Sequence, residues 1–143
     1  MAVTSHRGHA RIINPVPAVL VAGALALFLG AFLADWAYAS SYQVQWVNFA
    51  SWLIAGALVF TAFALVWAAV NALRKDGSRG RGEWLPIGLL AATFLLGLSN
   101  ALVHAKDGWA AMPAGLILSL VVLLLALAAT WVGFSQPRTG ETS

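Results

Sequence analysis

The chain has 143 residues, of which 61% are hydrophobic and 9% are charged, and its formal net charge is +3. Soluble domains carry about 25% charged residues, so this composition excludes an ordinary water-soluble globular domain. The absence of cysteine excludes disulfides, thiolate metal sites and covalent c-type haem attachment.

Four long apolar stretches follow one another along the chain. A tail of residues 1–13 leads to Asn14-Pro15-Val16-Pro17, where each proline disfavours helix in the residue before it. The stretches cover residues 17–38, 47–73, 84–105 and 113–134, and residues 135–143 form a second tail. Each stretch approaches or exceeds the ~20 apolar residues that a helix needs to cross a bilayer. The first exceeds the ~7–15 apolar residues of a signal peptide, so we expect the mature protein to keep it.

These stretches predict a single domain over residues 14–134, an all-α integral membrane four-helix bundle. The connections at residues 39–46 and 106–112 are short, so consecutive helices should be antiparallel neighbours. Helices in lipid approach each other through small residues. One such row repeats every four residues in the first stretch, and we predict that it is a helix contact: Ala22, Ala26, Gly30 and Ala34.

The basic residues are distributed unevenly between the two sets of connections. Seven of the eight Lys and Arg precede the first stretch, join the second to the third, or follow the fourth, and only Lys106 lies elsewhere. The positive-inside rule therefore places both termini and the basic loop in the cytoplasm. That loop is short, Gly-rich and positioned as a topological anchor, so we predict no nucleic-acid partner.

Polar residues converge near the outer ends of the predicted helices. Asp35 and His104 are the two ionisable residues within the predicted membrane helices, and such residues usually face the interior of a bundle. Asn100 lies four residues before His104 and so shares its helix face. We predict a buried Asp35–His104 contact with Asn100 beside it, and Asp107 at a similar depth in the following connection.

Two interpretations of these residues remain open. In the structural one, Asp35 hydrates or caps a helix end and His104 bonds a loop carbonyl. In the functional one, Asp35, Asn100, His104 and Asp107 relay protons or bind a ligand, with His104 facing a quinone head group or a haem b iron. No catalytic constellation or metal site is predicted, because no phosphate-binding loop or His-Glu-x-x-His motif occurs.

Three segments of the chain carry a family resemblance. They are Asn14-Pro15-x-Pro17, the run of residues 30–35 (GAFLAD) and the run of residues 100–107 (NALVHAKD). Over residues 13–134 the chain resembles the bacterial membrane domain of unknown function numbered 2231. The resemblance implies a four-span fold in the bacterial inner membrane and supplies no reaction. Relatives often begin the first span with His-Pro and carry a second histidine shortly after it. This chain has Asn14-Pro15 at that place and lacks the histidine that follows, which disfavours a haem or metal site.

The sequence therefore predicts a multi-pass inner-membrane protein with a polar cluster at its periplasmic face. We expect a non-enzymatic subunit or anchor without a cofactor, whose partners are lipid, another membrane or periplasmic protein, or further copies of itself. One alternative is an electron- or proton-transfer subunit that binds quinone or haem b near Asp35 and His104. Another is a small homodimeric transporter, which would need polar residues along the full depth of a helix.

Overall fold

Helices account for nearly all of residues 14–74 and 84–135, the part of the chain that the computed structural model describes. Four are long: α1 (Pro15–Ser41), α2 (Val44–Arg74), α3 (Trp84–His104) and α5 (Ala114–Ser135), with the one-turn α4 (Gly108–Ala111) between the last two. The four long helices are all apolar and long enough to cross a membrane. The basic loop apart from Arg74, and both predicted tails apart from Ser135, lie outside the described residues.

Local sequence explains where α1 begins and ends. The Asn14 side chain accepts a hydrogen bond from the Val16 amide at 3.2 Å, and proline occupies the first turn, where its missing N–H costs nothing. At the other end Tyr42 adopts a left-handed conformation, with φ 55°, and its N–H donates to the Tyr38 carbonyl at 2.7 Å. This turn reverses the chain, so that α2 begins at Val44.

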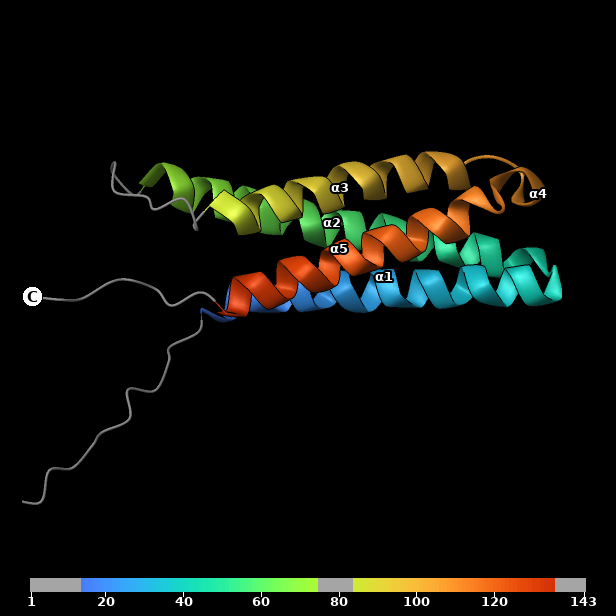
Figure 1. Cartoon of the computed structure of the whole chain (residues 1–143), viewed down its shortest axis with the longest axis horizontal. Helices are drawn as coiled ribbons and strands as arrows, with labels where there is room; N and C mark the ends of the chain where they lie inside the picture. Colours follow the sequence, from blue (N-terminus) through green and yellow to red (C-terminus); the bar gives the residue numbers. More distant parts are fainter. Residues whose placement is uncertain (1–13, 75–83, 136–143) are drawn as a thin grey trace, which may run out of the picture.

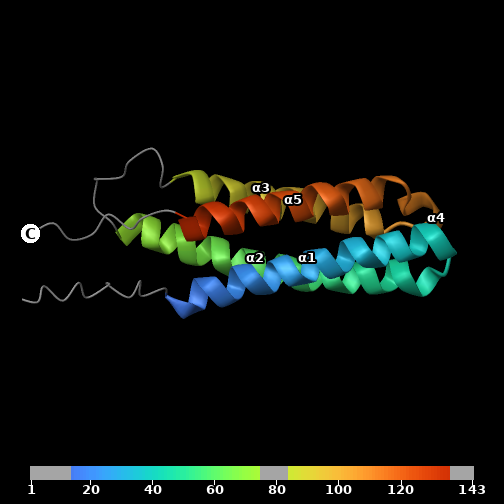
Figure 2. The ribbon, with the colours of Figure 1, turned by 60° about the horizontal axis from the view of Figure 1, so that its bottom comes forward.

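The four long helices lie side by side in one bundle (Figures 1 and 2), and each packs against two of the others. α1 packs against α2 and α5, and α3 packs against the same two helices, so α1 and α3 lie diagonally across the bundle. Consecutive long helices are antiparallel neighbours, as the short connections predict (Figure 1). The start of α1 and the end of α5 consequently lie at one end of the bundle, and α4 lies at the other.

The middle of the bundle is packed with apolar and mostly small side chains. The buried cluster comprises Ala24, Phe28, Ala57, Val122, Leu123 and Ala126. Phe28 is the largest of them, and a side chain at Gly97 would put a Cβ only 3.3 Å from its ring. Glycine at that position therefore lets the Phe28 ring lie against α3. This close packing matters because helices in lipid gain little from burying apolar surface against one another.

The predicted contact row of α1 is partly wrong. Ala34 is buried, but Ala22 and Ala26 are exposed, while Ala24 and Ala31 are buried instead. A helix has 3.6 residues per turn, so each step of four residues rotates about 40° beyond a full turn. Over three such steps the row turns from the exposed Ala22 to the buried Ala34, so only its last part faces the bundle.

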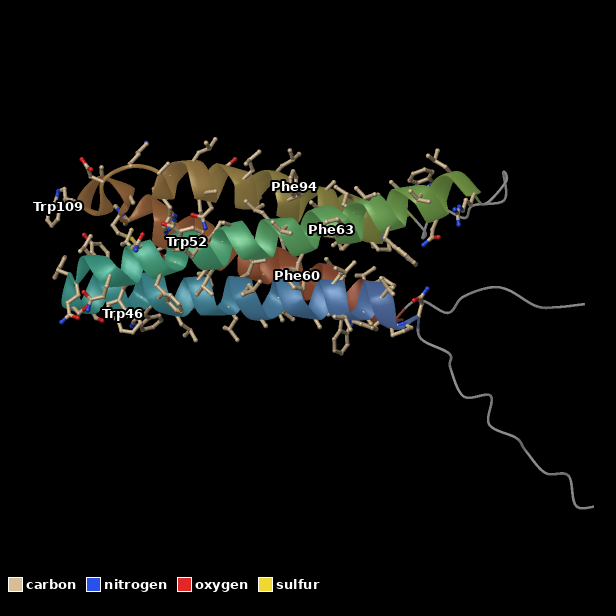
Figure 3. The ribbon with its side chains drawn as sticks, turned by 180° about the vertical axis from the view of Figure 1, so that it is seen from behind. Trp46, Trp52, Phe60, Phe63, Phe94 and Trp109 are labelled. Carbon is tan, nitrogen blue, oxygen red and sulfur yellow. The ribbon has the colours of Figure 1, made fainter. Side chains whose placement is uncertain are left out.

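Large aromatic side chains project from the outer surface of the bundle. Figure 3 shows Trp46, Trp52 and Trp109 toward the end that carries α4, and Phe63 farther along α2. All four are exposed. Tryptophan near a helix end and apolar side chains along the middle are the arrangement that a bilayer favours.

Candidate functional site

Four polar side chains meet inside the bundle near the α4 end. Asp35 comes from α1, Asn100 and His104 lie one turn apart at the end of α3, and Ser119 comes from α5. Asp35 and Asn100 are 0% exposed, Ser119 is 2% exposed and His104 is 6% exposed. We refer to these four residues as the polar cluster.

Hydrogen bonds connect the polar cluster into a closed circuit. The Asn100 side-chain amide donates from Nδ2 to Ser119 Oγ at 2.8 Å, and the Ser119 hydroxyl donates to Asp35 Oδ2 at 2.5 Å. The other carboxyl oxygen, Oδ1, lies 2.8 Å from His104 Nε2. His104 Nδ1 is 3.0 Å from the backbone carbonyl oxygen of Asn100, which returns the circuit to its starting residue.

This circuit determines how many protons the cluster holds. A carbonyl oxygen only accepts, so the contact with Asn100 requires a hydrogen on His104 Nδ1. If His104 is neutral, its Nε2 then carries a lone pair and bonds Asp35 only if the carboxyl group is protonated. If His104 is charged, Nε2 donates to a carboxylate. Both forms place one proton between Nε2 and Oδ1, and both leave the pair without net charge.

A glycine on α5 shapes the space around the imidazole ring. A Cβ built on Gly115 would lie 2.8 Å from His104 Cε1 and 3.4 Å from Nε2, so any side chain there would collide with the ring. Ser119 follows four residues later on the same face of α5. One face of α5 thus provides room for the imidazole and, one turn deeper, the hydroxyl that bonds Asp35.

The polar cluster links α1 and α3, two helices that do not otherwise pack closely against each other. The Asp35–His104 contact joins α1 to α3 across the diagonal, and Ser119 connects both to α5. Hydrogen bonds between membrane helices contribute about 0.6 kcal/mol on average. A buried ion pair often stabilises no more than an apolar pair of similar volume. Stability alone therefore does not account for a buried acid and a buried imidazole at this position.

The structure brings together three of the four residues proposed from sequence. Asp35, Asn100 and His104 join the cluster, but Asp107 is exposed and stands at the N-cap of α4. Ser99 is next to Asn100 in α3 and so lies at a similar depth, but it is exposed, and its hydroxyl donates to the carbonyl four residues earlier in its own helix. Depth alone therefore does not select the members, and the helix face does.

Sequence reasoning missed Ser119 as a member of the site. Its position one turn into the last helix is comparable in depth with Asn100, and its i, i+4 relation to Gly115 gives it the same face. Serine in a membrane helix often satisfies its hydroxyl on its own backbone, as Thr130 does on Ala126. The sequence alone did not show whether the Ser119 hydroxyl bonds its own helix or a side chain of another helix.

The engaged ring nitrogens also restrict what His104 can bind. A haem iron at Nε2 would have to displace the Asp35 carboxyl group, and one at Nδ1 would have to displace the Asn100 carbonyl. Among the described residues, no group of three or more His, Cys, Asp or Glu is placed to hold a metal ion.

Comparison with known proteins extends over the whole bundle. A family model described as "Predicted membrane protein (DUF2231)" matches residues 14–136, which include every member of the polar cluster. No curated protein and no solved structure matches the chain.

Proposed function

The chain belongs to the DUF2231 family of predicted membrane proteins, and we propose that its polar cluster makes it a proton-binding, non-enzymatic subunit of the bacterial inner membrane. The observation that carries the proposal is the orientation of His104. Because Nδ1 donates to the Asn100 carbonyl, the 2.8 Å contact between Nε2 and Asp35 needs one further proton. The pair as a whole binds and releases that proton.

Release of the proton would change the geometry of the bundle. It would leave a lone pair on Nε2 facing the Asp35 carboxylate, with a net negative charge in a site that is buried from bulk solvent. The contact would then be repulsive, and the link between α1 and α3 would be lost. Protonation of the pair is thereby coupled to how tightly the outer end of the bundle is held together.

The proton would exchange with one side of the membrane. Toward the other end of the bundle, the cluster is followed by the apolar core around Phe28 and Val122. Farther from the cluster along α2 and α3, the buried hydroxyls of Thr61 and Thr93 both donate to their own helix, at 2.7 Å. This arrangement favours a subunit over a transporter, which would need polar groups along the full depth of the bundle.

The distribution of charge suggests that this side is the periplasm. In the sequence, Lys106 follows α3, whose end carries His104. The other seven Lys and Arg precede α1, end or follow α2, or follow α5, and the positive-inside rule places such residues in the cytoplasm. We propose that the partner is a membrane or periplasmic protein, or a second copy of this chain. It would sense how tightly this end of the bundle is held together when the pair gains or loses its proton. A simple anchor remains the competing function, and it requires no proton release.

Infrared titration of the protein in lipid vesicles would test the proposal. The wild-type protein should lose one proton per chain from the pair as pH rises, seen as a change in the carboxyl or imidazolium bands. Asp35→Asn should abolish that change and keep the geometry, because an amide N–H can donate to Nε2 while the amide oxygen accepts from Ser119. The control Asp107→Asn alters an exposed carboxyl group outside the cluster and should leave the change intact.

The anchor would be the better account if the wild-type bands stay constant until the protein unfolds. The same conclusion would follow if Asp35→Asn and the wild type titrate identically.

A further inference from the structure

One polar atom of the cluster has no hydrogen-bond partner. The side-chain oxygen of Asn100, Oδ1, is buried and accepts no bond from any described group. Asn100 itself is 0% exposed. Leaving a buried acceptor unpaired costs about 1–3 kcal/mol, so native proteins usually satisfy such an atom with protein groups or with ordered water.

Rotation of the amide group does not remove the problem. Ser119 donates its single hydrogen to Asp35 Oδ2, so its oxygen can only accept from Asn100. The atom of Asn100 that faces Ser119 must therefore be the donor, Nδ2. Oδ1 is consequently fixed on the other side of the amide group, where it needs a donor.

We propose that Asn100 Oδ1 is the anchor of an internal water molecule that also contacts the Asp35 carboxyl group. Internal waters typically make about three hydrogen bonds to buried polar groups. Asn100 Nδ2 and Asp35 Oδ2 lie 2.8 and 2.5 Å from the same Ser119 oxygen, so a single hydroxyl separates the Asn100 amide group from the Asp35 carboxyl group. The carboxyl group has acceptor sites to spare, because a carboxylate offers about four and the circuit uses two.

Such a water would be the first acceptor of the proton that the Asp35–His104 pair releases. This role rests on the proposed function, whereas the water site itself rests only on the unpaired oxygen. A water that donates one hydrogen to Asn100 Oδ1 can turn a lone pair toward the Asp35 carboxyl group. It takes the proton as the carboxyl O–H bond breaks, which leaves a carboxylate beside a hydronium ion. The cluster would then contain a proton acceptor that is not an ionisable side chain.

A high-resolution crystal structure in lipidic medium would test the water site directly. The expected result is a density peak about 2.7–3.2 Å from Asn100 Oδ1 and within the same range of an Asp35 oxygen. The peak should disappear in Asn100→Leu, which removes the acceptor at similar volume, and persist in Ser99→Ala, which alters the adjacent exposed residue.

Two results would overturn the water site: Asn100 Oδ1 in contact with apolar atoms only, or Oδ1 accepting from a protein donor. If Asn100→Leu does not fold, the wild-type density still decides the matter. Failure here is separable from failure of proton binding, because the infrared titration of the pair does not require a located water.

Discussion

Gly115→Ala should break the contact on which proton binding depends. The added Cβ would stand 2.8 Å from His104 Cε1, whereas ordinary contacts of this kind begin at 3.4 Å. The ring would have to withdraw by the difference, about 0.6 Å. It cannot do so freely, because both of its nitrogens are hydrogen-bonded to other parts of the bundle.

The expected cost follows from these two constraints. Overpacking a well-filled site costs about 1–3 kcal/mol, and losing a bond between membrane helices costs up to about 1.7 kcal/mol. Alanine recovers at most about 1 kcal/mol over glycine in a helix. We therefore expect Gly115→Ala to lower the free energy of unfolding by about 2 kcal/mol.

Gly133→Ala provides the matched control for this variant. Gly133 lies near the other end of the same helix, and a Cβ there meets nothing within 4 Å. Reversible unfolding in detergent, followed by circular dichroism, would give both free energies. Equal stability of the two variants, with the titration of the Asp35–His104 pair unchanged in Gly115→Ala, would refute the reasoning.

Two further predictions concern the cluster and the orientation of the chain. Ser119→Ala leaves Asp35 Oδ2 and Asn100 Nδ2 without their partner, so it should destabilise the bundle by about 1–2 kcal/mol more than Ser99→Ala in the same unfolding assay. Equal effects would mean that the hydroxyl is dispensable. Because the chain has no cysteine, Ser41→Cys and Ser135→Cys can be labelled singly at the two ends of the bundle. An impermeant thiol reagent added outside intact spheroplasts should modify Ser41→Cys alone, and the reverse pattern would place the polar cluster at the cytoplasmic face.

The helices were predictable because length and apolarity are sufficient to define a membrane span. The predicted ranges differ from α1 and α2 by a few residues at the connection between them, where Tyr42 ends α1 in a left-handed conformation. Nothing in the local pattern required the turn to be so short. The row of residues led by Ala22 was only partly right for another reason, because alanine is so common in this chain that its spacing carries little information.

The contact between Asp35 and His104 was predictable from topology. Both residues lie near the α4 end of helices that run in the same direction, and each is costly to expose to lipid. The structure confirms this contact, while the role of the pair remains a prediction. What the sequence could not provide was the state of the imidazole. That state depends on the Asn100 carbonyl lying within reach of Nδ1, which is a matter of side-chain rotamer.

The most direct test of the account is nitrogen NMR of His104 in bilayers. His6 and His9, the other two histidines, would be replaced so that a single imidazole is observed. The account predicts that Nδ1 carries hydrogen whenever the cluster is intact, and that Nε2 shares a proton with Asp35 until that proton is released at higher pH. An imidazole with hydrogen on Nε2 and none on Nδ1, unaffected by Asp35→Asn, would contradict it.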